Sequence, residues 1–341
     1  MTRILTEPIR GPVAWSGSEL ASDERWIRRL SSSQLDELAR ALSAVNARAI
    51  PTTSIARDDF ELPLLARELA AVAEELEGGT GLTLLRGIPV ERYSEADAAR
   101  ILWGLGTHLG TAIPQNAAGD LVGHVRDAGK TLADPKARGY ETHERQSLHV
   151  DRCDVVALMC LRKAHSGGIS DVASTVRVHN EMLATCPWYL SALYRPFAID
   201  MRGEEQPGEP PVYYRPVFSW YEGHFAAGAN ATYIRSGQAK IGAPLSAVEE
   251  EALDAFYALA EKHKLAMDLE PGDVQLLNSY VTLHDRTAYV DDPDPAKKRH
   301  MLRLWLAVPN RRPLAPEFGT YHFRAQTSSF VPAGSSKKIA G

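Results

Sequence analysis

The stretch SLHVDRCD, from Ser147 to Asp154, places His149 and Asp151 two positions apart. In an extended strand, residues i and i+2 point to the same side, so the imidazole and the carboxylate would converge on one small volume. Polar heads buried together need each other, water or a metal ion. Because a plain ion pair at a strand edge has the same pattern, a third ligand is needed to favour a metal.

His284 is the candidate for that third ligand. It ends the partly apolar segment NSYVTLH, which follows the turn signal EPGD and a predicted strand over 274–277. Two histidines and one carboxylate, with other coordination positions left open, are the ligand set typical of non-haem Fe(II). Zinc accepts the same three ligand types, and spacing alone leaves both metals open.

Two arginines that follow His284 bear on the choice of metal. Arg299 and Arg303 are four positions apart before the apolar run LWLAV, so on a strand they share one face. A buried guanidinium requires an anion, and its geometry matches a carboxylate through two parallel hydrogen bonds. An iron oxygenase that uses 2-oxoglutarate needs such a partner for the distal carboxylate of that acid. The acidic loop DDPDP at 291–295 is the alternative partner for one or both arginines.

The chain resembles the taurine-dioxygenase and clavaminate-synthase-like group of Fe(II)- and 2-oxoglutarate-dependent oxygenases. The resemblance depends on four motifs in that family's order: HVD at 149–151, SGGIS at 166–170, LHDRTAY at 283–289 and RHMLRLWL at 299–306. It extends from about Gly81 to Pro309. It implies a distorted double-stranded β-helix (jelly-roll) core, and hydroxylation of an unactivated C–H by O₂ with release of succinate and CO₂.

The resemblance also implies site residues. The iron ligands, which carry the catalysis, would be His149, Asp151 and His284. Arg299 would bind the distal carboxylate of 2-oxoglutarate, Ser170 would contact the same co-substrate, and Arg303 would contact either the co-substrate or an anionic group of the substrate. Related halogenases have Gly or Ala at the position of Asp151, so oxygenation is implied rather than halogenation. His284 and Arg299 are further apart than in some relatives, which leaves open which arginine is the main anchor.

A cluster of aromatic and basic residues points to the substrate. The segments PPVYYRPVFSWYEGHF and YIRSGQ, at 210–225 and 233–238, combine both residue types. We expect a small-molecule substrate that carries a carboxylate or a sulfonate, bound by Arg303, Arg235, Arg215, Tyr213 and Arg152. For the aromatic residues, packing between strands is the alternative role.

The elements that must position these residues fall into two parts. Residues 1–110 are predicted to be mostly helical and packed on the core, with helices that begin near Ser32 or Ser33 and at Ser94. Residues 111–310 are predicted to be a mainly β, jelly-roll core. Its expected strands include Val172–Val176 and Ala231–Ile234, and a helix is inserted near 246–264 with a capping box at Ser246 and Glu249. We expect one oxygenase domain over 1–330 and a flexible tail over 331–341.

Composition further narrows the classes of protein to which the chain can belong. The 341 residues are 44% hydrophobic and 24% charged, with a net charge of −5, which is ordinary for a soluble globular protein. No basic block favours nucleic acid, and the longest apolar run, Val155–Leu161, is too short for a membrane span of about 20 residues. Three cysteines and the lack of a signal-like N-terminus favour the cytoplasm. Self-association into a homo-oligomer stays open.

Three functions therefore compete. The first is an oxygenase that uses Fe(II), 2-oxoglutarate and O₂. The second is a zinc-dependent hydrolase or isomerase, and the third is a non-catalytic metal-binding jelly-roll protein. Arg299 and Ser170 favour the first, because a hydrolase needs no buried partner for a second carboxylate.

Overall fold

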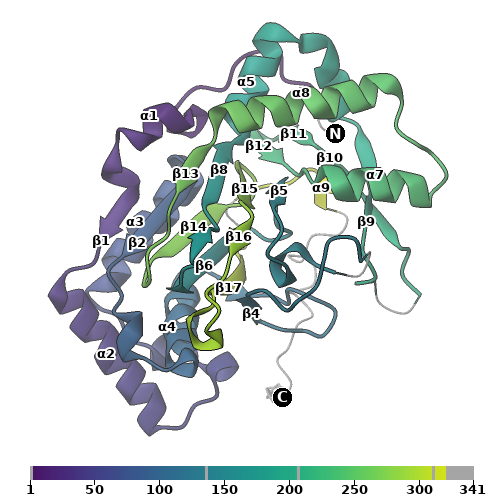
Figure 1. Ribbon diagram of the computed structural model, residues 1–341. Coiled ribbons are helices and arrows are strands. Elements are labelled where there is room, and N and C mark those ends of the chain that lie inside the picture. Colours follow the sequence, from purple (N-terminus) through teal and green to yellow (C-terminus); the bar gives the residue numbers. More distant parts are fainter. Residues whose placement is uncertain (1–2, 135–136, 206–207, 309–311, 320–341) are drawn as a thin grey trace, which may run out of the picture.

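The computed structural model describes residues 3–134, 137–205, 208–308 and 312–319, and the predicted tail over 331–341 lies outside them. The chain is a mixture of helix and sheet, with helices outside and strands between them (Figure 1). The helices are α1 (Gly17–Ala21), α2 (Ser32–Ala47), α3 (Leu65–Gly78), α4 (Glu95–Thr107), α5 (Thr175–Thr185), α6 (Leu190–Leu193), α7 (Ala231–Lys240), α8 (Ala247–His263) and α9 (Pro316–Gly319).

Two sheets dominate the described residues. The larger has seven strands, in the order β1 (Ile27–Arg29), β2 (Leu82–Arg86), β14 (Val274–Asn278), β6 (Val155–Arg162), β17 (His300–Ala307) and β3 (Thr111–Ala112), with β4 (Val122–Val125) also paired to β17. The smaller has four strands, in the order β13 (Leu265–Met267), β8 (Ser170–Ser174), β15 (Thr282–Arg286) and β5 (Gln146–His149). Apart from the parallel pair β1–β2, the pairings in both sheets are antiparallel.

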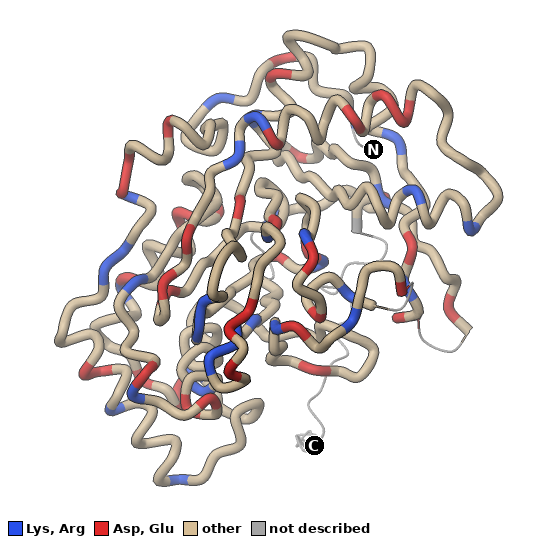
Figure 2. The backbone as a smooth tube through the Cα atoms, viewed as in Figure 1, with Lys and Arg blue, Asp and Glu red and all other residues tan. Residues whose placement is uncertain are grey.

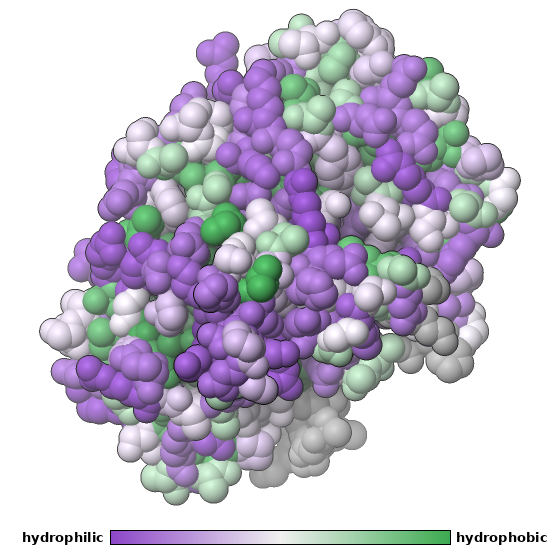
Figure 3. Space-filling model, viewed as in Figure 1, coloured by the Kyte–Doolittle hydropathy of each residue, from purple (hydrophilic) through white to green (hydrophobic). Residues whose placement is uncertain are grey.

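Three two-stranded units complete the strands. These are β9 (Pro196–Asp200) with β10 (Val212–Pro216), β11 (Phe218–Tyr221) with β12 (His224–Ala227), and β7 (Ser166–Gly167) with β16 (Tyr289–Val290). Lys, Arg, Asp and Glu are interspersed along the chain rather than gathered by sign (Figure 2). The face shown in Figure 3 is mainly hydrophilic, with hydrophobic residues scattered over it. No helix in the described ranges is both long and apolar enough to cross a membrane.

The apolar core lies in three layers, which follow from the alternation of side chains along the strands. Helices α2, α3 and α4 pack on the outer face of the large sheet, where Leu302 and Leu304 of β17 point. Met301 and Trp305, on the opposite face of β17, pack between the two sheets with Val172 of the small sheet. Helices α5, α6 and α8 cover the outer face of the small sheet together with β9–β12.

Several predicted elements are confirmed. Helix α4 begins after Ser94, whose hydroxyl accepts a hydrogen bond from the Asp97 amide, and α8 has the predicted capping box of Ser246 and Glu249. Helix α2 is capped by Ser31, one residue before the predicted start. Strands β6, β9, β11, β14 and β17 lie within two residues of the strands predicted over 155–161, 197–201, 217–221, 274–277 and 302–308.

Two predicted strands are wrong in whole or in part. Ala231–Ile234 is the first turn of α7, because the Asn230 side chain accepts from the Tyr233 amide and caps a helix there, which overrides the β preference of the local residues. The strand expected over Val172–Val176 stops at Ser174, whose hydroxyl caps α5 in the same way.

Candidate metal centre

The candidate centre lies where β5 and β15 pair in the small sheet. The register of that pair sets His284 directly opposite His149, and Asp151 follows His149 by two residues. Each Nε2 lies 3.6 Å from an oxygen of Asp151, and the two ring centroids are 4.4 Å apart. One ligand atom from each side chain fits within a group no wider than 4.8 Å. The pairing of distant strands therefore brings the three predicted ligands together.

The orientation of His149 suits a metal ligand. Its Nδ1 lies 2.8 Å from the Ser147 carbonyl oxygen, which can only accept, so Nδ1 carries the proton and Nε2 keeps a lone pair. The amide nitrogen of Gln146 lies 3.2 Å from that Nε2 and satisfies the lone pair in this structure. A metal ion bound by Nε2 would replace this contact.

Asp151 is buried yet ionised. Burial opposes the charge of its carboxylate, but Arg303 and the two histidines outweigh that effect and hold the pKa of Asp151 well below its usual range. Nη1 of Arg303 lies 3.6 Å from Oδ2, and the indole nitrogen of Trp305 donates to the same oxygen at 2.8 Å. Oδ2 is thereby held in place, and Oδ1 is the oxygen nearer to His149.

Burial, followed by the neighbouring His149, lowers the pKa of His284 to about 3. Its imidazole is therefore neutral near pH 7, which is the form that binds metals. A carboxylate beside a neutral imidazole is a donor set for a borderline divalent ion such as Fe(II) or Zn²⁺.

Arg303 is fixed by the protein itself. Its Nε donates to Oε1 of Gln115 at 2.7 Å, and the Gln115 amide donates back to the Arg303 carbonyl oxygen at 2.8 Å. The guanidinium lies 4.9 Å from the ring centroid of Tyr140 and 4.8 Å from that of Trp305. Arg303 therefore places a positive charge beside Asp151 and extends along the cavity wall.

Arg299 differs, because its side chain is buried without a hydrogen-bonded acid. It is 2% exposed, and neither Nε nor Nη1 has a hydrogen-bond partner among the described residues. The acidic loop reaches it only through the backbone, where the Arg299 amide donates to Asp291 Oδ1 at 2.7 Å. The guanidinium lies over the Tyr289 ring at 5.1 Å. A Cβ at Gly168 would come within 3.1 Å of Nε, so glycine leaves room for this side chain.

A cavity opens beside His149 and Asp151 of the triad. Its lining is polar and aromatic, and it includes Arg138, Tyr140, Gln146, Arg152, Tyr213, Asn230, Tyr233, Arg303 and Trp305. The carboxylate of Glu204 lies 2.8 Å from Nη1 of Arg138 and also pairs with Arg152. Two guanidiniums thus contact one carboxylate in the cavity lining, and Arg303 adds a further positive charge.

The predicted substrate residues separate into two groups. Arg152, Tyr213 and Arg303 line the cavity. Arg215 is buried behind them, with its guanidinium 5.7 Å from the Tyr213 ring centroid. Arg235 is not brought to the site: it lies on α7 and pairs with Glu250 and Asp254 of α8 at the surface, which corrects its assignment.

Ser170, predicted to contact the co-substrate, is buried on β8. Its hydroxyl accepts a hydrogen bond from the Gln275 amide of β14 at 3.0 Å. Ser170 therefore lies between the two sheets, and its hydroxyl can accept from Gln275 while donating its own hydrogen to a ligand oxygen.

Other cavity residues were not predicted. Trp305 follows Arg303 by two positions and therefore lies on the same face of the strand. The alternation that pointed to the two arginines could also have pointed to Trp305. Arg138, Tyr140 and Gln146 lie in or beside a stretch without helical or strand periodicity, and no spacing in the sequence singles them out. Gln115, in the turn-like segment PQN, is buried and holds Arg303 rather than only forming a turn.

Comparison with known proteins gives consistent matches. Residues 46–305 match the model of the family described as taurine catabolism dioxygenase TauD, TfdA family. FR-33289 synthase from Streptomyces rubellomurinus is 35% identical over 329 residues, which cover 95% of this chain and 97% of that protein. Taurine hydroxylase-like protein SAT17 from Stachybotrys chartarum is 26% identical over 314 residues, 88% of this chain and 80% of that protein.

Solved structures share the fold. An asparagine oxygenase in complex with Fe(II), 2S,3S-3-hydroxyasparagine and succinate superposes with a TM-score of 0.66 at 18% identity, over 83% of this chain and 94% of that one. The non-haem iron oxygenase OrfP in complex with Fe, succinate and (3S)-hydroxy-L-Arg gives 0.61 at 14% identity, over 82% and 94%. The arrangement of helices and sheets is therefore that of oxygenases of this kind.

Proposed function

Because this chain belongs to the TauD, TfdA family of Fe(II)- and 2-oxoglutarate-dependent dioxygenases, we propose that it hydroxylates a small acidic molecule at an iron held by His149, Asp151 and His284. The overall reaction consumes the substrate, O₂ and 2-oxoglutarate and yields the hydroxylated product, succinate and CO₂. Bound iron and 2-oxoglutarate would supply the activation of O₂. The chain's own residues orient the reactants around them.

The observation that carries this proposal is the convergence of two imidazole nitrogens and one ionised carboxylate within 4.8 Å. Trp305 and Arg303 hold the carboxylate from behind, so it can offer its free oxygen to the metal without turning away. Three protein ligands leave positions for a bidentate co-substrate and for oxygen.

Arg299 supports 2-oxoglutarate as the co-substrate. A buried guanidinium with unpaired nitrogens is costly, and a carboxylate that binds it through two hydrogen bonds would remove that cost. Met301 and Trp305 of β17 point between the sheets, Arg303 lines the cavity, and Arg299 directly precedes this strand. We therefore assign Arg299 to the distal carboxylate, and we propose that the Ser170 hydroxyl assists it.

We further propose that the two sheets are the two halves of a distorted double-stranded β-helix. Their packing through a shared apolar layer and their antiparallel pairing support this assignment. In such a barrel, the metal ligands lie near the strand ends that face the cavity.

The cavity wall supports an acidic substrate. Arg138 and Arg152 both contact the carboxylate of Glu204, and Arg303 adds a third guanidinium to the same cavity lining. Guanidinium groups match the geometry of a carboxylate or a sulfonate, so a cavity lined by three of them favours a substrate with such a group. Tyr213, whose ring lies 5.9 Å from the Arg152 guanidinium, would bound the same subsite.

The test is a screen for succinate release, with Fe(II), 2-oxoglutarate and O₂ present. The panel begins with taurine, L-asparagine and L-arginine, which the names of the relatives suggest, and each product is analysed for the addition of one oxygen atom. His149→Ala serves as the blank, and His165→Ala, at an exposed histidine on a loop, serves as the matched control. We expect substrate-stimulated succinate in the wild type and the control only. Equal succinate in the His149→Ala variant would refute the assignment.

A further inference from the structure

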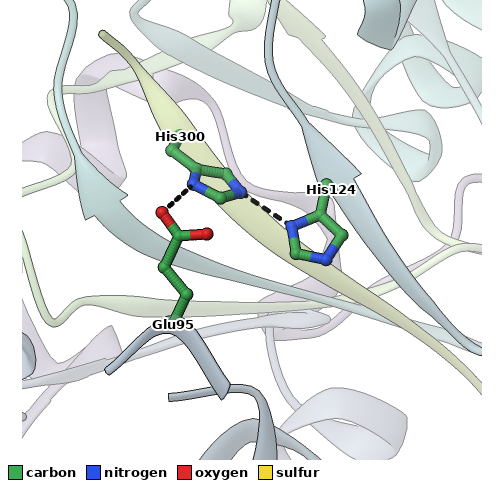
Figure 4. A group of neighbouring side chains, drawn as sticks. All are labelled: Glu95, His124 and His300. Carbon is green, nitrogen blue, oxygen red and sulfur yellow. Dashed lines mark hydrogen bonds and ion pairs between the residues drawn. The ribbon is translucent and has the colours of Figure 1, made fainter. Parts of the chain in front are cut away.

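A second group of potential metal ligands lies on the opposite side of β17 from the triad. Glu95, the first residue of α4, His124 of β4 and His300 of β17 converge there (Figure 4). One ligand atom from each lies within 4.8 Å of the others. His300 is completely buried, whereas Glu95 and His124 are exposed, so solvent reaches the group from one side.

The spacing of the two rings suits a metal ion. Nδ1 of His124 lies 2.8 Å from Nε2 of His300. A single proton can bridge these nitrogens, whereas two nitrogens bound at about 2.0–2.1 Å to one tetrahedral zinc ion are about 3.3 Å apart, so the rings need to separate by only about 0.5 Å. The rings are tilted by 34° and their centroids are 5.1 Å apart, so a small outward rotation of the exposed His124 would open the position between them.

The protonation states of His300 and Glu95 both favour the binding of a cation. Burial is the main reason that the pKa of His300 falls to about 4, so this ring is neutral near pH 7. The pKa of Glu95 is lowered, chiefly by a hydrogen bond from Arg162, so its carboxylate is ionised. Neutral imidazole and carboxylate are the forms that zinc binds.

Arg162 is the competing group. Its Nη2 lies 2.9 Å from Glu95 Oε1 and 3.1 Å from His300 Nδ1, and it occupies the space in which the carboxylate would turn. The Arg162 side chain is 34% exposed, so it can move into solvent when the carboxylate turns towards the metal. Arg126 adds a second nearby positive charge that lowers the affinity. These cations set a moderate affinity rather than a tight structural site.

We propose that Glu95, His124 and His300 form a second metal site, which binds Zn²⁺ and is separate from the iron triad. The ion would be held by Nδ1 of His124 and Nε2 of His300, with water at the fourth position. Oε1 of Glu95 lies 3.2 Å from Nδ1 of His300, so the Glu95 side chain would turn to supply the third ligand. It would join α4, β4 and β17. Since Arg299 directly precedes His300, zinc would stabilise the strand that carries the co-substrate arginine.

The experiment measures zinc bound per chain by equilibrium dialysis of metal-free protein, followed by elemental analysis. Zinc also suits the triad, so we expect two zinc ions in the wild type and one in His124→Asn. In a His149→Ala/His284→Ala background, which removes two triad ligands, we expect one, and none after His124→Asn is added. Glu95→Gln in that background should weaken binding by at least the ~10-fold typical of a lost supporting group.

His165→Asn, at an exposed histidine outside both groups, is the control for adventitious binding and should match the wild type. Circular dichroism of each variant verifies the fold, and His124 is chosen over the buried His300 for that reason. Equal zinc in the wild type and in His124→Asn would show that the two rings share only a proton, and would overturn the proposal. Succinate release by zinc-free, iron-loaded His124→Asn should equal that of the wild type, so this test is independent of the proposed oxygenase function.

Discussion

Arg299→Met should separate co-substrate binding from stability. In the wild type the guanidinium is 2% exposed and has two unpaired nitrogens, so the protein without ligand carries the cost of a buried, unpaired cation. A methionine of similar length packs against Tyr289 without a charge. We therefore expect the ligand-free variant to unfold at the same temperature as the wild type or at a higher one.

The loss should appear only when 2-oxoglutarate binds. Two charge-assisted hydrogen bonds, each about 1.5–3 kcal/mol, amount to a loss of about 3–5 kcal/mol for a buried pair that loses one partner. At about 1.4 kcal/mol for each factor of ten, the dissociation constant of 2-oxoglutarate should rise by about two to three and a half orders of magnitude. Arg299→Lys keeps the charge but loses the paired geometry, so its dissociation constant for 2-oxoglutarate should lie between those of the wild type and Arg299→Met.

The assay is an anaerobic titration of the Fe(II)-loaded protein with 2-oxoglutarate, followed by the visible charge-transfer band, with thermal unfolding of the same samples. Arg235→Gln, at a surface arginine paired with α8, is the matched control and should change neither measurement beyond a modest loss of stability. The assignment of Arg299 would be refuted by an Arg299→Met variant that still binds 2-oxoglutarate with near wild-type affinity. A large fall in the unfolding temperature of the ligand-free variant would refute the argument from the unpaired cation.

Three further predictions follow from the surroundings of the site. Trp305→Phe removes the hydrogen bond to Asp151 Oδ2, so the affinity for iron should fall by about 10- to 100-fold, as measured by a competition titration with a chelator. An unchanged affinity would mean that the indole does not help to hold Asp151 for the metal. Gly168→Ala adds a methyl group 3.1 Å from Arg299 Nε, so it should weaken 2-oxoglutarate binding while leaving iron binding intact. Because Gly168 has a φ of +72°, the same change should lower the free energy of unfolding by about 1–2 kcal/mol. Equal binding of 2-oxoglutarate by this variant would contradict the steric argument. Burial, followed by a neighbouring carboxylate, raises the pKa of Asp285 from 3.8 to about 6, so the folded state binds its proton more tightly than the unfolded state and stability falls as the pH rises through this interval. Asp285→Asn should therefore gain up to about 3 kcal/mol over the wild type above pH 7 and almost nothing below pH 4, as measured by denaturant unfolding across that range, and a gain that does not vary with pH would refute this cause.

Much of the site could be predicted from the sequence, because the spacings that define it are between neighbouring residues. Asp151 lies two positions after His149, and Arg303 lies four after Arg299, so strand alternation alone puts each pair on one side. That His284 would meet His149 depended on the resemblance to a family, because no local pattern specifies which distant strands pair. The register between β5 and β15, which sets the two histidines opposite each other, is a property of the assembled sheet.

The errors in the sequence-based predictions have physical causes of the same kind. Ala231–Ile234 has residues suited to a strand, but the cap at Asn230 begins a helix, and this places Arg235 at the surface beside α8. Arg138 reaches the cavity from a stretch without periodicity, so its role depends entirely on tertiary contacts such as that with Glu204. Propensity describes the segment, whereas the position of a loop side chain depends on what it packs against.

The pairing of β5 with β15 also has a consequence for how the enzyme matures. A metal that bridges these two strands closes a loop that includes β6, β8 and all of β9–β14. Such a cross-link stabilises the folded state by lowering the conformational entropy of the unfolded chain, and the effect grows with the length of the closed loop. Because the ligands meet only after the long connection has folded back, the chain should capture iron late in folding. Once captured, the ion should slow the opening of the small sheet, and its loss would loosen the oxidising centre before the helical layer around α2–α4.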